Sequence, residues 1–439
     1  MTERRARGHR DVWRIAAPMI VSNVTVPLLG IVDTAVMGHL DHPRYLAAVA
    51  VGATIFSFLF LGLNFLRMGT TGLAAQAFGA GDAGEQRTVL VQALLVALAM
   101  AAALILLQRP VGHLAMRLIA PEPEVVPAAW TYYSVRIWAA PAALANFALV
   151  GWFIGMQDTR RPLVLMLAVN LANIALSVFL VVGLGYRTGG VAAASVVAEW
   201  LGLGLGLLLV RRMLPAGGRT DWQRVRDPVR IRRMLGVNAN LLVRTLSLMF
   251  VFGFVTAQGA RFGTAVLAAN ALLIQFQYFM AYALDGFAHA AEALAGRALG
   301  ARDVAAFRRA VRLSLAWTVG VAAAFTVAYG VAGPGLVALM TDQAGLRAVA
   351  LEYLPWIVVS PLVSCWSFLL DGVFVGATWS TAMRNAMALS AFGVFVPVFY
   401  ASQAAGLGNH GLWLAFLAFM AARGVSMGVI YARRAPAPS

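Results

Sequence analysis

Long apolar runs recur along the chain and are separated by short polar gaps. A helix needs about 20 apolar residues to cross roughly 30 Å of hydrocarbon, so each run predicts a membrane span. The first half has six predicted spans, at about 12–38, 45–72, 88–108, 128–154, 162–184 and 189–213. The second half has six more, at about 232–258, 265–290, 308–330, 349–375, 384–404 and 409–431. The pattern therefore predicts an all-α polytopic membrane protein with about twelve transmembrane helices.

The two halves repeat one another at a constant offset, which relates AAQAFGAGD at 74–82 to AGRALGARD at 295–303. The same offset pairs small and aromatic residues of the fourth span in each half, Gly151, Phe153 and Gly155 with Gly372, Phe374 and Gly376. Because six spans return the chain to the same side of the membrane, the halves should be parallel repeats, an arrangement typical of transporters. We predict two six-helix lobes with pseudo-two-fold symmetry, residues 1–213 and 232–439, joined by a polar cytoplasmic linker at 214–231.

Composition agrees with the bilayer as solvent, since 61% of the residues are hydrophobic and 12% are charged. The net charge of +16 does not predict a nucleic-acid partner, because the basic residues are spread between spans instead of gathered on one face. Most arginines fall in the termini and in alternate loops. The opposite set of loops holds six, namely Arg44, Arg109, Arg117, Arg187, Arg261 and Arg347. This bias predicts that both termini are cytoplasmic.

The chain contains no lysine, and this absence excludes two functional classes. A Walker A phosphate loop needs Gly-Lys-Ser/Thr, and a retinal Schiff base needs a lysine amine. The single cysteine, Cys365, has no partner for an intrachain disulfide, and no residues show metal-ligand spacing. We therefore expect a transporter without ATP hydrolysis, cofactor or metal, and not an enzyme.

Asp33, late in the first span, is the sharpest candidate for coupling chemistry. Placing a carboxylate at the bilayer centre costs on the order of 3 kcal/mol of insertion free energy, so an acid there is expected to have a functional or structural role. Burial favours the neutral acid, which lets such a group bind and release a proton as its cavity opens to either side. The alternative is a structural aspartate hydrogen-bonded to a neighbouring helix.

The fifth span carries Asn170, Asn173 and Ser177 at i, i+3 and i+7, which places them on one helical stripe. The stripe predicts either an ion or proton site, or hydrogen bonds that join helices. Ser195 and Glu199 on the sixth span are four residues apart and could join this network.

The eighth span predicts a polar and aromatic seam in the second lobe, formed by Gln275, Tyr278, Tyr282, Asp285, His289 and Glu292. Asp371 in the tenth span adds another buried acid. Arg244 in the seventh span is a candidate countercharge, so these acids either contact substrate or ions, or form a fixed ion pair that locks the lobe. Arg67, Arg136 and Arg423 are expected to snorkel or to pair structurally.

Several stretches together resemble the multidrug and toxic compound extrusion family, with the greatest likeness to its DinF branch. They are residues 13–41, 65–80, 281–293 (AYALDGFAHAAEA), 369–378 (LLDGVFVGAT) and 407–415 (LGNHGLWLA). The resemblance implies an antiporter that exports amphipathic, commonly cationic, organic compounds in exchange for protons or sodium. It implies that Asp33 is the coupling acid, with Asn173 beside it. Relatives usually carry Asp where this chain has Ser177, which disfavours a sodium site and favours protons.

Asp371 matches an acid that some relatives use in the tenth span, whereas their acid in the seventh span is absent here. The resemblance further implies a monomer in the bacterial inner membrane, in contact with lipids and small organic substrates. A lipid flippase of the same superfamily is the alternative, and it would favour a more basic cavity for anionic head groups. A membrane receptor would need an extramembrane sensing domain, and the predicted loops are too short to form one.

Overall fold

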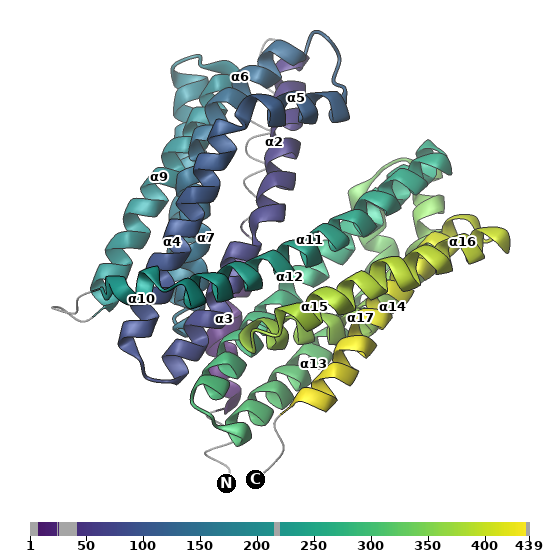
Figure 1. The fold of residues 1–439 in the computed structure, drawn as a ribbon. Helices are drawn as coiled ribbons and strands as arrows, with labels where there is room; N and C mark the ends of the chain where they lie inside the picture. Colours follow the sequence, from purple (N-terminus) through teal and green to yellow (C-terminus); the bar gives the residue numbers. More distant parts are fainter. Residues whose placement is uncertain (1–7, 24, 26–41, 215–219, 436–439) are drawn as a thin grey trace. The chain divides into compact units, whose positions relative to one another are not determined.

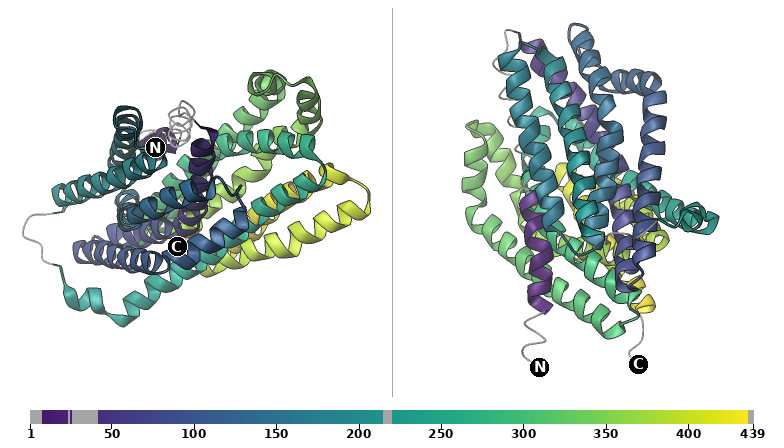
Figure 2. Two further views of the ribbon diagram at one scale, coloured as in Figure 1. Left: turned by 90° about the horizontal axis from the view of Figure 1, so that it is seen from above. Right: turned by 90° about the vertical axis from the view of Figure 1, so that its left-hand side faces the viewer.

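The computed structural model describes residues 8–23, 25, 42–214 and 220–435, and these residues form an all-helical protein (Figure 1). No strand occurs among them. The predicted all-α class is confirmed. Two further views of the helices are given in Figure 2.

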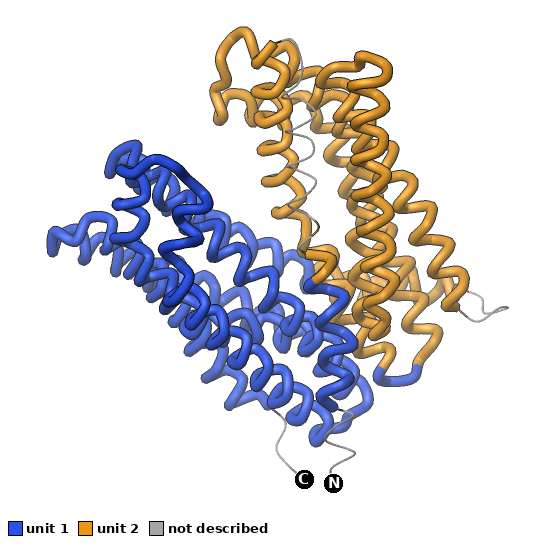
Figure 3. The backbone as a smooth tube through the Cα atoms, turned by 180° about the vertical axis from the view of Figure 1, so that it is seen from behind, with its two compact units in different colours: residues 1–20, 79–81, 236–439 blue, residues 21–78, 82–235 orange. Residues whose placement is uncertain are grey.

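The chain folds into two compact units, which are coloured separately in Figure 3. The first-half unit contains residues 21–78 and 82–235, and the second-half unit contains residues 1–20, 79–81 and 236–439. Besides residues 79–81, the division departs from the predicted lobes 1–213 and 232–439 near the start of each half. Residues before Val21 belong to the second-half unit, and the chain up to Leu235 belongs to the first-half unit.

The helices of the first half follow one another with short connections. They are α2 (Pro43–Leu63), α3 (Phe65–Gly79), α4 (Ala83–Leu106), α5 (Gln108–Ile119), α6 (Val126–Arg136), η1 (Ile137–Ala139), α7 (Ala140–Gly155), α8 (Arg160–Val178), η2 (Phe179–Gly183) and α9 (Arg187–Met213). The short helix α10 (Trp222–Arg226) and the start of α11 (Pro228–Arg261) follow in the same unit.

The helices of the second half are longer and less interrupted. They are the remainder of α11, then α12 (Thr264–Gly300), α13 (Val304–Met340), α14 (Ala344–Gly376), α15 (Ser380–Ala388), η3 (Leu389–Phe395), α16 (Val396–Ala404) and α17 (Gly408–Arg434). Residues 8–23 form a further helix at the start of the chain.

Eleven helical segments in the described part of the chain are long and apolar enough to cross a membrane. They correspond one to one with the predicted spans from the second to the twelfth, and most are longer at their ends than the apolar run alone indicated. The first predicted span, 12–38, begins within the helix of residues 8–23, and its later part lies outside the described residues.

The duplication read from the sequence is reproduced in the backbone. Asp82 caps the start of α4 by accepting a hydrogen bond from the Glu85 amide at 2.9 Å, and Asp303 caps α13 through the Ala306 amide at 2.8 Å. The residue before each cap adopts a left-handed backbone, Gly81 with φ 69° and Arg302 with φ 57°. The cap and the left-handed residue thus recur at matching positions of the two loops.

Glycines set the same close helix packing in both units. A Cβ placed on Gly151 would lie 2.3 Å from the carbonyl oxygen of Arg67, and one on Gly372 would lie 2.1 Å from that of Ala288. One turn later, Gly155 and Gly376 meet Thr71 and Glu292 in the same way. Only glycine lets these backbones approach so closely, which explains why the pairs read from the sequence include glycines.

Candidate functional site

A buried amide and hydroxyl cluster lies in the first-half unit. Asn173 on α8 donates to the Ser195 hydroxyl on α9 at 2.7 Å, and the Ser177 hydroxyl donates to the Asn173 side-chain oxygen at 3.3 Å. All three side chains are at most 3% exposed. The predicted stripe thus faces the interior of its unit at Asn173 and Ser177, and it includes Ser195 of the neighbouring helix.

Two neighbouring contacts complete the polar interior of this unit. Asn170 donates to the Thr25 hydroxyl at 3.1 Å, which connects α8 with the first helix of the chain. Glu199 accepts a hydrogen bond from Asn146 on α7 at 2.9 Å, so Glu199 pairs with α7 instead of joining the Asn173 cluster. Asp33, the predicted coupling acid, lies outside the described residues.

The second-half unit contains a buried ion cluster instead. The Asp371 carboxylate on α14 pairs with Arg244 on α11 and accepts a hydrogen bond from Arg423 Nη2 on α17 at 2.7 Å. Arg423 is 2% exposed and Asp371 is 7% exposed. The predicted contact between Arg244 and an acid is thus present, and Arg423 is paired in the interior and does not snorkel. The cluster joins three helices.

The predicted seam on α12 divides by burial along the helix. It runs from exposed Gln275 and Tyr278 through half-buried Tyr282 and Asp285 to buried His289 and Glu292. On the exposed face, Tyr278 stacks on Phe252 with ring centroids 5.7 Å apart. Asp285 lies near Tyr282 and near Arg423 of the ion cluster.

Sequence reasoning missed a set of buried polar contacts next to this seam. The Ser360 hydroxyl on α14 donates to Gln277 at 2.6 Å, and Gln277 is 2% exposed although its neighbours Gln275 and Tyr278 are exposed. Asn270 and Asn409 exchange hydrogen bonds at 2.7 and 3.0 Å. Gln277 lies one helical turn before Met280, which is fully buried, and this spacing is the signal that could have placed it in the interior.

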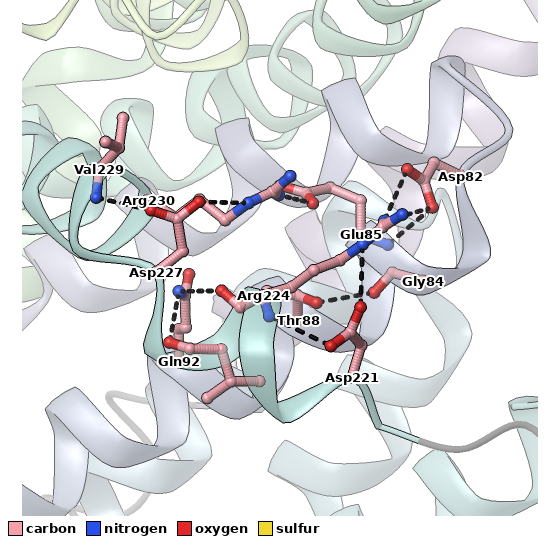
Figure 4. A network of polar contacts seen from close by, with 11 residues as sticks. Asp82, Gly84, Glu85, Thr88, Gln92, Asp221, Arg224, Asp227, Val229 and Arg230 are labelled. Carbon is pink, nitrogen blue, oxygen red and sulfur yellow. Dashed lines mark hydrogen bonds and ion pairs between the residues drawn. The ribbon is translucent and has the colours of Figure 1, made fainter.

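The stretch predicted as a linker is partly helical and is fastened to the first-half unit. Arg224 on α10 pairs with Asp82 at 3.1 Å, and Arg230 at the start of α11 pairs with Glu85 (Figure 4). Gln92 on α4 also donates to the Val225 carbonyl at 3.0 Å. These contacts bring the GAGD loop and the connection between the halves together.

Comparison with known proteins identifies the family. The family model MatE matches residues 18–179 and 241–401, which together make up most of both halves. This chain belongs to the MatE family. A MatE protein of Escherichia coli, "DNA damage-inducible protein F", is 44% identical over 97% of this chain and 92% of its own length. The "Probable multidrug resistance protein NorM" of Bradyrhizobium diazoefficiens is 26% identical over 92% of this chain and 89% of its own.

A solved MatE structure supports the fold. It is described as the outward-facing conformation of a multidrug resistance MATE family transporter of the MOP superfamily. It superposes with a TM-score of 0.87 over 97% of this chain and 96% of its own, at 18% identity. The predicted family and its DinF branch are confirmed, and the protein is a multi-pass membrane transporter.

Proposed function

We propose that this MatE protein is a secondary antiporter that exports amphipathic, cationic organic compounds in exchange for protons. Family membership supports transport, and the NorM relatives named as probable multidrug resistance proteins support drug-like substrates over the lipid flippase alternative. The lack of lysine agrees with an ion gradient as the energy source, because the Walker A loop of many ATP-driven pumps needs one.

The observation that carries the assignment of coupling to the first-half unit is the pairing of Asp371 with two arginines. Its charge is already compensated by Arg244 and Arg423, so this acid serves the structure of its unit. The first-half unit offers neutral acceptors and donors instead, at Asn173, Ser177 and Ser195. We assign the coupling step to Asp33, with the Asn173 cluster as the polar surroundings of the ion pathway.

The choice of proton over sodium rests on Ser177. A sodium ion takes several oxygen ligands at once, whereas a proton needs a single carboxylate. The buried Ser177 hydroxyl donates to Asn173 and brings no second charge to this place. We further infer a monomer in the bacterial inner membrane with both termini in the cytoplasm, without ATP, cofactor or nucleic-acid partner.

The decisive experiment replaces Asp33 with asparagine and measures substrate-triggered proton movement in everted vesicles. Asp33→Asn removes the titratable group and keeps the size of the side chain, so we expect full insertion and loss of proton movement. Asp342→Asn is the matched control, because the Asp342 side chain is fully exposed, and it should transport normally. Undiminished antiport by well-expressed Asp33→Asn protein would refute the coupling assignment.

A second measurement separates the two ions. Vesicles with an imposed sodium gradient at constant pH should show no substrate movement in the natural protein. Ser177→Asp supplies a second carboxylate next to Asn173, and we expect this variant to gain a response to sodium. A sodium response of the natural protein would overturn the choice of protons. A panel of cationic dyes and labelled lipids, tested in the same proteoliposomes, separates drug export from lipid movement.

A further inference from the structure

A cavity of about 570 Å³ lies in the first-half unit, and the Asn173 cluster is not among its described lining residues. It is formed by the starts of α2, α6 and α9 and by the segment before α6. The residues that matter for its chemistry are Arg44, Tyr45, Glu124, Thr131, Arg187 and Thr188. All of them belong to the same unit.

Two arginines meet over one aromatic ring in this cavity. The guanidinium carbons of Arg44 and Arg187 lie 4.9 and 5.0 Å from the centroid of the Tyr45 ring. Arg44 also donates to the Tyr45 hydroxyl at 2.9 Å. Tyr45 is 7% exposed, so its ring forms a buried part of the cavity wall against which both cations lie.

The acidic charge in the cavity does not balance the two arginines. Glu124 is the one carboxylate among the described lining residues, and it lies 3.8 Å from Arg44 and 3.5 Å from His42. Its side chain is 57% exposed. Arg187 has no carboxylate partner among the described residues. The cavity thus presents a net positive charge, with Arg187 available to a ligand.

The duplication provides an internal test of whether the fold needs these arginines. At the matching positions, the second copy has Ala265 in place of Arg44 and Gly408 in place of Arg187. The two copies agree in backbone two residues before the second position, where Gly185 and its counterpart Gly406 have φ of 72° and 73°, whereas Gly408 itself is left-handed at φ 52° and Arg187 is not. The second copy folds without the arginine pair, so the pair is an addition to the scaffold.

The placement of the pair also runs against the general distribution of charge. The loops on the side of the membrane opposite the termini hold only six arginines, and two of them line this cavity. In addition, α9 begins at Arg187 without a side-chain cap, and its first helical hydrogen bond runs from the Gly190 amide to the Tyr186 carbonyl at 3.0 Å. The amides of Arg187, Thr188 and Gly189 precede that bond and can donate to a bound anion.

We propose that this cavity is a binding site for a phosphate-bearing anion, held by Arg44 and Arg187. Paired guanidinium groups recognise phosphate oxygens through charge-assisted hydrogen bonds. The phosphate belongs either to an anionic phospholipid head group or to a soluble molecule. The site does not depend on ion coupling, so purified Asp33→Asn protein should bind the same anion.

The test uses the full-length protein in detergent. Inorganic phosphate is titrated at constant ionic strength while the midpoint of thermal unfolding is followed, and retention of short-chain phosphatidylglycerol is compared with phosphatidylcholine by native mass spectrometry. We expect Arg44→Gln/Arg187→Gln to weaken binding by at least about tenfold, the value of one lost charge-assisted contact. Arg109→Gln/Arg117→Gln removes the same charge from exposed residues of α5 and should change affinity by less than about twofold.

Arg187→Gln alone guards against a folding defect, because this exposed side chain makes no ion pair among the described residues, and it should weaken binding by about the same factor. Binding of phosphate by itself assigns the site to a soluble phosphorylated ligand, and selective retention of phosphatidylglycerol assigns it to a lipid; either result supports the proposal. Equal affinity of the natural and Arg44→Gln/Arg187→Gln proteins for both probes overturns it. So does the absence of saturable binding of either probe.

Discussion

The two units of this MatE protein share several local backbone features and have different interiors. The capping aspartates, the left-handed residues and the close glycine contacts recur with one offset. The polar interior does not recur. The first-half unit buries neutral amides and hydroxyls around Asn173, and the second-half unit buries the ion cluster of Asp371. The two halves therefore share the residues that helix caps and close helix packing require, and they differ in the polar residues that they bury.

A second difference concerns the segment that begins each half. Residues 8–20 pack in the second-half unit through aromatic rings, with Trp13 at 5.2 Å from Phe287 and 5.1 Å from Trp317. The corresponding segment before Gly236 packs in the first-half unit through the ion pairs of Arg224 and Arg230. Equivalent segments of the two halves are therefore held by aromatic packing in one unit and by ion pairs in the other. Salt screens the ion pairs but not the aromatic contacts.

The largest effect is expected from breaking the ion cluster. Asp371→Asn removes the carboxylate that pairs with buried Arg423 and with largely buried Arg244, which should cost about 3–5 kcal/mol of unfolding free energy. In the other unit, Asn173→Ala removes neutral hydrogen bonds and should cost about 1–3 kcal/mol. Unfolding in sodium dodecyl sulfate titrations measures both values.

The same assay contains its own control. Replacing all three charged residues by apolar ones of similar size, Asp371→Leu with Arg244→Met and Arg423→Met, should restore most of the lost stability, because no charge then remains unpaired. A loss for Asp371→Asn no larger than that for Asn173→Ala would contradict the contrast between a charged and a neutral interior.

A smaller effect is expected where the units are alike. Gly151→Ala and Gly372→Ala each place a Cβ within 2.3 Å of a carbonyl oxygen, so each should cost about 1–3 kcal/mol, and the two losses should be similar. Gly204→Ala serves as the control, because nothing lies within 4 Å of its Cβ position and alanine favours the helix. If the two substitutions lowered the unfolding free energy by very different amounts, the helices around Gly151 and Gly372 would not be packed equivalently.

The smallest effect is expected at the ion pairs of the connecting segment. Arg230→Gln should cost about 0.2–1 kcal/mol at low salt, since both partners of its pair with Glu85 are partly exposed, and the difference should disappear at high salt. Trp13→Leu in the second-half unit is the comparison, and its effect should not depend on salt. A cost for Arg230→Gln that persists at high salt would assign the role to packing of the side chain instead of its charge.

The sequence predicted the spans and the duplication well because each depends on local and repeated signals. An apolar run of about 20 residues can be recognised from the local sequence alone, and glycines that allow close packing recur at matching positions of the two halves. The stripe of Asn173 and Ser177 was found for the same reason, since helical spacing alone places both residues on one face.

Contacts between distant residues could not be read in this way. Arg423 and Arg244 meet Asp371 from helices that are far apart in the sequence, and nothing in spacing alone selects one acid among several. The polar stretch at 214–231 looked like a plain linker because its arginines have their partners, Asp82 and Glu85, in a distant part of the chain. The predicted role of Asp33 is untested, as that residue lies outside the described part.

The exchange of starting segments bears on ancestry. Each half places the beginning of its first helix in the unit of the other half, so neither half contains all of its own compact unit. Two copies of a single half, each lending its N-terminal arm to the other, would form a swapped homodimer with the same pattern. Fusing those copies end to end would leave the arms where they are found.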